Sequence, residues 1–155
     1  MKISNVTFKI DIPLDEDGFF SMQCPYCNNR FKINGQYFKT LDKDEVFCPI
    51  CGLANKVSTF YTKETIDLSM SIAKNYAEEI IYNAFKGFNS KRRTKGIIKT
   101  KGFKKPSPIV ESLYENDDTL IMAHKECCNV KLKVTVLDKW LTPYCIKCGG
   151  YEHER

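Results

Sequence analysis

"CPYCNNRFKINGQYFKTLDKDEVFCPICG", residues 24–52, contains two Cys-x-x-Cys pairs with twenty residues between them. Each pair places two thiols on one tight turn, and a chain reversal between the pairs brings all four together. Four donors at about 2.3 Å from one ion form the closed tetrahedral site that structural zinc prefers. The stretch therefore predicts a metal site with four ligands: Cys24, Cys27, Cys48 and Cys51.

Residues 24–52 resemble a zinc ribbon, a module common in transcription, translation and nucleic-acid-processing proteins. The stretch "CPICG", residues 48–52, also resembles the rubredoxin loop, so iron is chemically admissible at the same site. The string "CPYC", residues 24–27, matches the redox dithiol of glutaredoxin-like enzymes, but that dithiol needs a helix starting at the first cysteine. Asn34-Gly35 instead predicts a β-hairpin between the two pairs. A closed zinc site is therefore favoured over redox chemistry.

A second set of cysteines near the C-terminus repeats this pattern with changes. Residues 128–134 align with residues 27–33, and the last Cys-x-x-Cys pair is also followed by glycine. His124 is the most economical donor to complete the set, through one neutral ring nitrogen. Knuckle spacing favours Cys127 as the next ligand, whereas strand register favours Cys128. We expect a Cys3His zinc site with these ligands: His124, Cys127, Cys145 and Cys148, with Cys128 as the alternative to Cys127.

Residues 62–88 have helical periodicity, with apolar residues at three- and four-residue steps. Thr62 and Thr65 offer N-caps, and Gly87 suits the end of the helix. The apolar stripe of this long amphipathic helix packs within the chain or against the same helix of a second copy. It consists of Ile66, Met70, Ala73, Ala77, Ile80, Ile81, Ala84, Phe85 and Phe88.

Alternating and β-branched runs predict strands at residues 3–12, around Asn34-Gly35, at 119–123 and at 129–138. In the last run, one face carries Val130, Leu132, Val134 and Val136. The expected fold is a small, metal-stabilised α+β fold, with two zinc-ribbon modules joined by a long amphipathic helix and a basic linker. The expected segments are an N-terminal strand and first ribbon at 1–61, the helix at 62–89, the linker at 90–108 and the second ribbon-like module at 109–155.

The excess positive charge lies in one segment. The net charge is +5, yet residues 90–108 carry eight basic groups and no acidic group. Two glycines and two prolines indicate an extended linker, and its charges suit phosphate or an acidic protein surface. Phe103, and Tyr37-Phe38 of the first module, are candidates for stacking on unpaired bases. The basic residues are Lys91, Arg92, Arg93, Lys95, Lys99, Lys101, Lys104 and Lys105.

The sequence has no signal peptide and no apolar run of membrane-spanning length, which predicts a cytoplasmic protein. In that reducing compartment its eight cysteines favour metal over disulfides, and we expect two zinc ions per chain. Closed sites, without a serine-hydrolase motif or a phosphate-binding glycine loop, indicate no enzyme and no small-molecule substrate.

The predicted function is a zinc-binding, non-enzymatic nucleic-acid-binding protein. DNA and RNA are both open as its target, and the ribbons serve as rigid recognition modules. The alternative is a protein–protein interaction subunit or adaptor of a multi-component complex, which docks through helix 62–88 and the ribbon surfaces, including as a homodimer.

Overall fold

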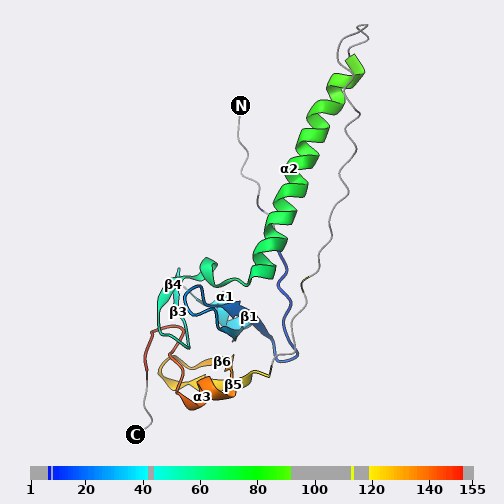
Figure 1. Cartoon of the computed structure of the whole chain (residues 1–155). Helices are drawn as coiled ribbons and strands as arrows, with labels where there is room; N and C mark the ends of the chain where they lie inside the picture. Colours follow the sequence, from blue (N-terminus) through cyan, green and yellow to red (C-terminus); the bar gives the residue numbers. More distant parts are fainter. Residues whose placement is uncertain (1–6, 8, 42–43, 92–112, 114–118, 152–155) are drawn as a thin grey trace. The chain divides into compact units, whose positions relative to one another are not determined.

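A computed structural model of the chain describes residues 7, 9–41, 44–91, 113 and 119–151 (Figure 1). The chain divides into two compact units. The described part of one unit, residues 1–11 and 66–112, consists mostly of helix α2 (Lys63–Lys91). The other unit, residues 12–65 and 113–155, contains every described strand and all eight cysteines.

The larger sheet of the cysteine-bearing unit has four antiparallel strands in the order β1-β2-β6-β5. These strands are β1 (Phe19–Gln23), β2 (Arg30–Asn34), β5 (Ile121–Lys125) and β6 (Val130–Val134). A smaller sheet pairs β3 (Glu45–Phe47) with β4 (Ala54–Lys56), on either side of the Cys48–Cys51 turn. The α+β class is as predicted, but strands from the two predicted modules form one continuous sheet through the β2–β6 pair.

Side-chain alternation along β6 sets its buried face. Val130, Leu132 and Val134 are fully buried, as predicted. The prediction for Val136 is wrong, because β6 ends at Val134 and Val136 is 50% exposed. Thr135 ends the strand by capping helix α3 (Val136–Trp140), where its side chain accepts a hydrogen bond from the backbone N–H of Asp138.

The hairpin predicted at Asn34-Gly35 is also wrong. Asn34 is the N-cap of helix α1 (Gly35–Lys39), and its Oδ1 accepts hydrogen bonds from the backbone N–H groups of Gln36 (2.9 Å) and Tyr37 (3.2 Å). The chain reverses instead between β1 and β2, at the first cysteine pair. Both edges of β2 are occupied, by β1 and β6, so no returning strand can pair there. Asparagine suits either role locally, and the strand pairing selects the helix cap.

The unit contains two repeats with the same order of elements. The first repeat (residues 19–53) and the second repeat (residues 121–150) each consist of a strand, a cysteine-bearing turn, a strand, a short helix and a Cys-x-x-Cys-Gly turn. The aligned Asn28 and Asn129 both have positive φ, at 58° and 52°. Gly52 and Gly149 are likewise at 73° and 69°. The internal duplication read from the sequence is therefore a duplication of backbone structure.

Equivalent contacts join the repeats, as expected for a pseudo-two-fold arrangement. The backbone N–H of Phe47 donates to the carbonyl of Ile146 at 3.0 Å. The aligned N–H of Tyr144 donates to the carbonyl of Pro49 at 2.8 Å. Because each bond is the counterpart of the other, the same local structure supplies both sides of the interface.

Two lysines face each other where β2 pairs with β6. Lys32 lies opposite its counterpart Lys133, an arrangement that repels unless acidic groups compensate it. Asp15 Oδ2 lies 3.6 Å from Lys32 Nζ and 2.9 Å from Lys133 Nζ. Asp17 Oδ2 lies 2.6 Å from Lys133 Nζ. The acidic turn before β1 thus stabilises the junction of the repeats.

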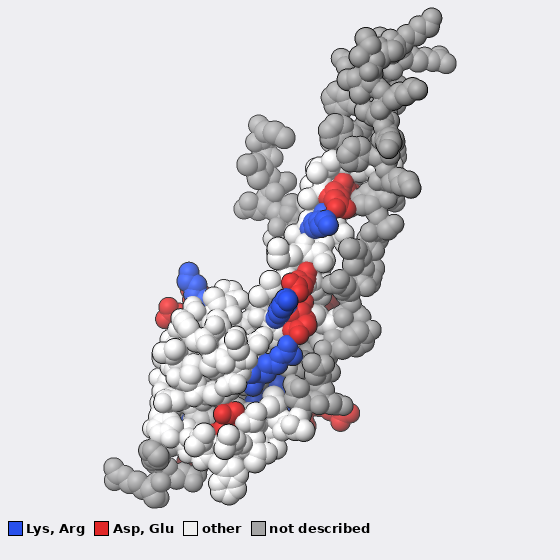
Figure 2. Space-filling model, viewed as in Figure 1, with Lys and Arg blue, Asp and Glu red and all other residues white. Residues whose placement is uncertain are grey.

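Helix α2 confirms the predicted long helix. Thr62 Oγ1 accepts a hydrogen bond from the backbone N–H of Thr65 at 3.4 Å, as expected of an N-cap. Figure 2 shows basic side chains beside acidic ones along the helix. One ion pair of α2 joins Lys74 Nζ to Glu78 Oε1 at 4.0 Å. None of the helices in the described ranges has the length and apolar character needed to cross a membrane. The described members of the predicted stripe that are exposed are Ile66, Met70, Ala73, Ala77, Ile80, Ile81 and Ala84.

Two predicted segments lie wholly or largely outside the described residues. For the predicted strand at residues 3–12, residues 7 and 9–12 are described and are not in a strand. Of the predicted basic linker, residues 92–108 are outside the described ranges, and Lys91 is the last residue of α2.

Candidate metal centres

The first cysteine group consists of Cys24, Cys27, Cys48 and Cys51, the four residues predicted. The β1–β2 turn supplies the first two, and the turn between β3 and β4 supplies the others. The Sγ atoms of Cys24 and Cys51 lie 3.7 Å apart, and those of Cys27 and Cys48 lie 3.8 Å apart. Sulfurs at about 2.3 Å from a shared centre are roughly 3.8 Å from one another in a tetrahedron. The spacing therefore fits one tetrahedral zinc ion.

Backbone N–H groups point at the sulfurs of this group. The N–H of Tyr26 lies 3.4 Å from Cys24 Sγ, and the N–H of Ile50 lies 3.4 Å from Cys48 Sγ. Burial alone would raise the pKa of the Cys24 thiol. The backbone N–H groups of Cys27 and Tyr26 favour the thiolate more strongly, so the net pKa is lowered. Burial dominates at Cys48 and raises its pKa. A bound cation would offset this cost of ionising buried thiols.

The Cys-x-x-Cys-Gly turn has the same hydrogen bonds in both repeats. The N–H of Gly52 donates to the carbonyl of Cys48 at 3.0 Å, and the N–H of Gly149 donates to the carbonyl of Cys145 at 2.8 Å. The positive φ of both glycines favours a residue without Cβ. The matching geometry means that each repeat presents its second ligand pair in the same way.

The second cysteine group consists of Cys127, Cys128, Cys145 and Cys148, whose Sγ atoms all lie within 4.8 Å of one another. Cys127 Sγ and Cys148 Sγ are 3.6 Å apart, again close to a tetrahedral edge. Where the sequence indicated one of the adjacent cysteines, the structure brings both to the group.

The paired cysteines have a structural explanation in the turn between β5 and β6. Strand register places Lys125 where the first repeat has Cys24, so that ligand position is lost. Cys127 and Cys128 lie instead in the 3-10 helix η2 (Glu126–Cys128), where successive residues are about a third of a turn apart. Two neighbouring side chains can therefore approach one ion from different directions.

His124 is not a member of the second group. Its Nε2 lies 2.8 Å from Asn129 Oδ1, across the turn that carries Cys127 and Cys128. On β5, His124 and Lys125 point to opposite faces, which removes His124 from the face to which the turn delivers its thiols. The structure thus places Cys128 in the position that the sequence assigned to histidine. The alignment of residues 128–134 with 27–33 was the signal that favoured Cys128.

The two groups differ in exposure. Cys24 and Cys48 are buried, whereas Cys127 and Cys148 are exposed. The N–H of Gly150 is the main cause that lowers the pKa of Cys148, to about 7, against the opposing effect of burial. The pKa of Cys127 is raised, first by burial and then by the neighbouring Cys145 and Cys148. The second group is therefore the more accessible to chelators and other reagents.

The donor sets fit zinc. Each group offers four thiols with nearly tetrahedral spacing, the donor set of closed structural zinc sites. Zinc held by these residues would tie the strand turns to the Cys-x-x-Cys-Gly turns within each repeat. No protein-family model, curated protein or solved structure matches this chain.

Proposed function

We propose that the protein is a zinc-binding, non-enzymatic nucleic-acid-binding protein in which residues 91–105 contact phosphate. The observation that carries the proposal is the charge of this segment: eight basic groups and no acidic group within residues 90–108. In the sequence, the segment connects α2 to the second repeat. Lysine and arginine side chains on such a segment release counterions when they bind nucleic acid, which gives strong, salt-dependent affinity.

The two cysteine groups support a structural role for zinc in the protein that we propose to bind nucleic acid. Four thiols in each group are positioned to bind one ion, and a four-thiolate zinc site is chemically closed. Because the repeats share a sheet, two ions would make one rigid unit from short elements. A rigid unit reduces the conformational entropy that is lost when a ligand binds.

Fluorescence anisotropy with labelled single-stranded and duplex oligonucleotides tests the proposal. Affinity should fall steeply with salt. Replacement of Lys99, Lys101, Lys104 and Lys105 by glutamine should reduce the slope of log affinity against log salt by roughly three to four. Lys74→Gln is a single-charge control outside the segment, since that lysine lies on α2 beside Glu78. An affinity that changes neither with salt concentration nor with the four substitutions would refute the proposal.

A second candidate function, docking to another protein through α2, is favoured by the exposed apolar stripe of that helix. Ile66, Met70, Ala73, Ala77, Ile80 and Ala84 are exposed and alternate in steps of four and three residues, the spacing of a coiled-coil seam.

Sedimentation equilibrium tests docking between two copies of the chain. Ile80→Glu should shift an associated protein to monomer, and Asn83→Glu, an equally charged change off the stripe, should leave association intact. A monomer at all concentrations would exclude self-association through α2.

A further inference from the structure

A cleft of about 480 Å³ lies between β5 and α3 in the second repeat. Its lining comes from Ile121, Ala123, His124 and Lys125 of β5, from Lys139 and Trp140 of α3, and from the residues that follow each element. It is separate from the second cysteine group, none of whose four cysteines lines it. The charges and aromatic surface in this cleft have no role in the metal centres described above.

The cleft exists because large side chains of the first repeat have small or polar counterparts here. Met22 pairs with Phe31, and its counterpart Ala123 pairs with Leu132. In the same register, Phe20 corresponds to Ile121 and Phe38 to Lys139. In the first repeat the rings of Phe20 and Phe38 pack edge to face, with centroids 5.1 Å apart. Without that ring pair and without Met22, the second repeat keeps open space between its strand and its helix.

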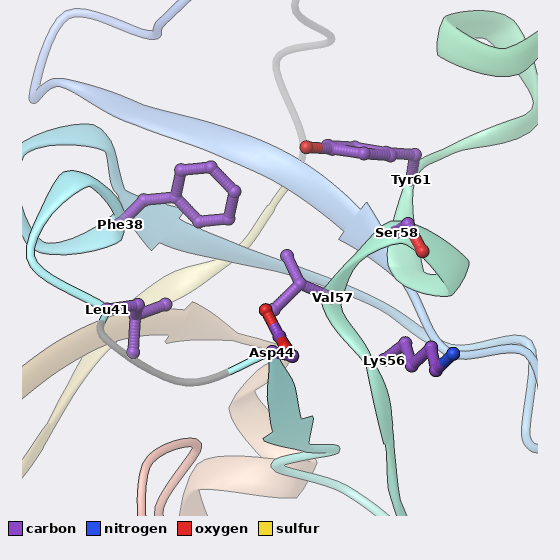
Figure 3. Close-up of a pocket in the computed structure, with 7 residues that line it drawn as sticks. All are labelled: Phe38, Leu41, Asp44, Lys56, Val57, Ser58 and Tyr61. Carbon is purple, nitrogen blue, oxygen red and sulfur yellow. The ribbon is translucent and has the colours of Figure 1, made fainter.

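The first repeat also has a cover that the second lacks among the described residues. Tyr61 forms a β-bridge with Met22, which brings the segment from β4 to Tyr61 alongside β1. Figure 3 shows Val57 and Tyr61 of this segment on the same pocket as Phe38, with Asp44 and Lys56 as charges of opposite sign. In the part of the chain that the structure describes, β5 is the last strand of its sheet, and no segment pairs with its outer edge.

The chemistry of the cleft suits a phosphate beside a flat ring. Lys125 is only 4% exposed, and none of the described acidic side chains forms an ion pair with it. A largely buried lysine without a counter-charge among the described residues favours an anionic partner. Lys139 adds a second positive charge, while Glu126 contributes the one carboxylate of the lining. Trp140 is 82% exposed and presents an indole face of the kind on which bases stack.

We propose that this cleft binds one unpaired nucleotide of a single-stranded nucleic acid, with its base on Trp140 and its phosphate at Lys125 and Lys139. The inference rests on the proposed function and names the form of nucleic acid that the protein recognises. A double strand keeps its bases stacked within the helix, so a duplex cannot offer a base to the indole. The cleft therefore selects single strands, whereas the basic segment does not.

Tryptophan fluorescence tests this site directly, because Trp140 is the only tryptophan in the chain. Titration of the full-length, zinc-loaded protein with a twelve-nucleotide oligothymidylate should reduce the fluorescence at least about twofold by stacking. A duplex of the same length and inorganic phosphate alone should leave it nearly unchanged. Anisotropy of the same oligonucleotide, labelled with fluorescein, reports binding anywhere on the protein.

Two variants locate the contact. Ala123→Met restores the side chain of the first repeat and fills the cleft, so it should abolish the quenching. Lys125→Met should weaken single-strand binding about tenfold, within the range expected for one nucleotide contact. The matched control is Lys131→Met, which removes an equal charge from an exposed position of β6 and should change neither signal. If Ala123→Met does not fold, Trp140→Leu takes its place, with affinity measured by anisotropy.

The outcomes separate the two proposals. Quenching that is lost in Ala123→Met and kept in Lys131→Met supports the site. Anisotropy that reports binding while Trp140 fluorescence stays constant overturns the site and leaves the proposed function standing. Quenching that persists in Ala123→Met places the contact outside the cleft and also overturns it. Absence of oligonucleotide binding by either signal overturns both proposals.

Discussion

Replacing Gly149 with alanine should destabilise the junction of the two repeats more than the same change at other glycines of positive φ. A Cβ at residue 149 would lie 2.7, 2.8 and 3.1 Å from three ring atoms of Phe47. Phe47 also donates the backbone hydrogen bond to Ile146 that joins the repeats, so it cannot move freely. The substitution therefore tests whether this close packing holds the two repeats together.

The expected magnitude has two parts. Gly149 has a φ of 69°, and a left-handed conformation costs a residue with a Cβ about 1–2 kcal/mol. Forcing a methyl group into a packed contact typically costs about 1–3 kcal/mol more. We expect Gly149→Ala to lower the free energy of unfolding by roughly 2–5 kcal/mol, a large share of the stability of a small domain.

Two other glycines provide controls for the separate parts. Gly18 has a φ of 80°, but a Cβ added there would lie 3.9 Å from its nearest neighbour, Asn34 Nδ2. Gly18→Ala therefore carries the backbone cost of about 1–2 kcal/mol without a clash. A Cβ at Gly52, the counterpart of Gly149, would lie 3.0 to 3.2 Å from the ring of Tyr144. The predicted order of destabilisation is Gly149, then Gly52, then Gly18.

Urea unfolding followed by far-ultraviolet circular dichroism measures these differences. Zinc must be held at the same excess for every variant, because a ligand that binds only the folded state adds to its stability. Phe47→Leu in the Gly149→Ala background should recover part of the loss, although Phe47→Leu alone destabilises. The reasoning is refuted if Gly149→Ala costs no more than Gly18→Ala, or if Phe47→Leu worsens both backgrounds equally.

Three further predictions concern the metal groups and the lysine pair. Chelation at neutral pH should unfold the cysteine-bearing unit, since zinc contributes on the order of 10 kcal/mol in comparable small sites. Metal analysis over time should show release from the more exposed second group first. A circular dichroism spectrum that is unchanged after complete metal removal would contradict this prediction. Cys128→Ser should lower the bound zinc from two ions per chain towards one, whereas His124→Ala should leave two; the opposite pattern in mass spectrometry of the native protein would restore histidine as the ligand. Asp15→Asn should cost about 1–3 kcal/mol at pH 7, because it removes the carboxylate that lies near both Lys32 and Lys133. Burial opposes ionisation of Asp15, but the hydrogen bond from Lys133 and the other favourable contacts lower its pKa below 3.8, so its stabilisation is lost only under more acidic conditions and the cost should stay constant between pH 8 and pH 5. A cost that disappears within that range would show that the ion pair is not its cause.

The amino-acid sequence was sufficient wherever a short stretch determines its own chemistry. The two Cys-x-x-Cys pairs of residues 24–52 indicated the first group, and the repeated Cys-x-x-Cys-Gly turn indicated a second. The threonine cap at Thr62 and the apolar period after it indicated α2. In these cases residues close in sequence supply the hydrogen bonds or the donor atoms, so the local pattern is sufficient to predict the local structure.

The tertiary structure decided everything that depends on which strands pair. Asn34 caps a helix because β1 and β6 already occupy both edges of its strand. The second group uses both Cys127 and Cys128 because the register of β5 and β6 puts Lys125 at the lost ligand position and turns His124 to the other face. The cleft beside Trp140 exists because Ala123 stands where the first repeat has Met22. Such equivalences become visible only when residues about a hundred positions apart are brought into one sheet, since pairing register is a long-range property that no local pattern encodes.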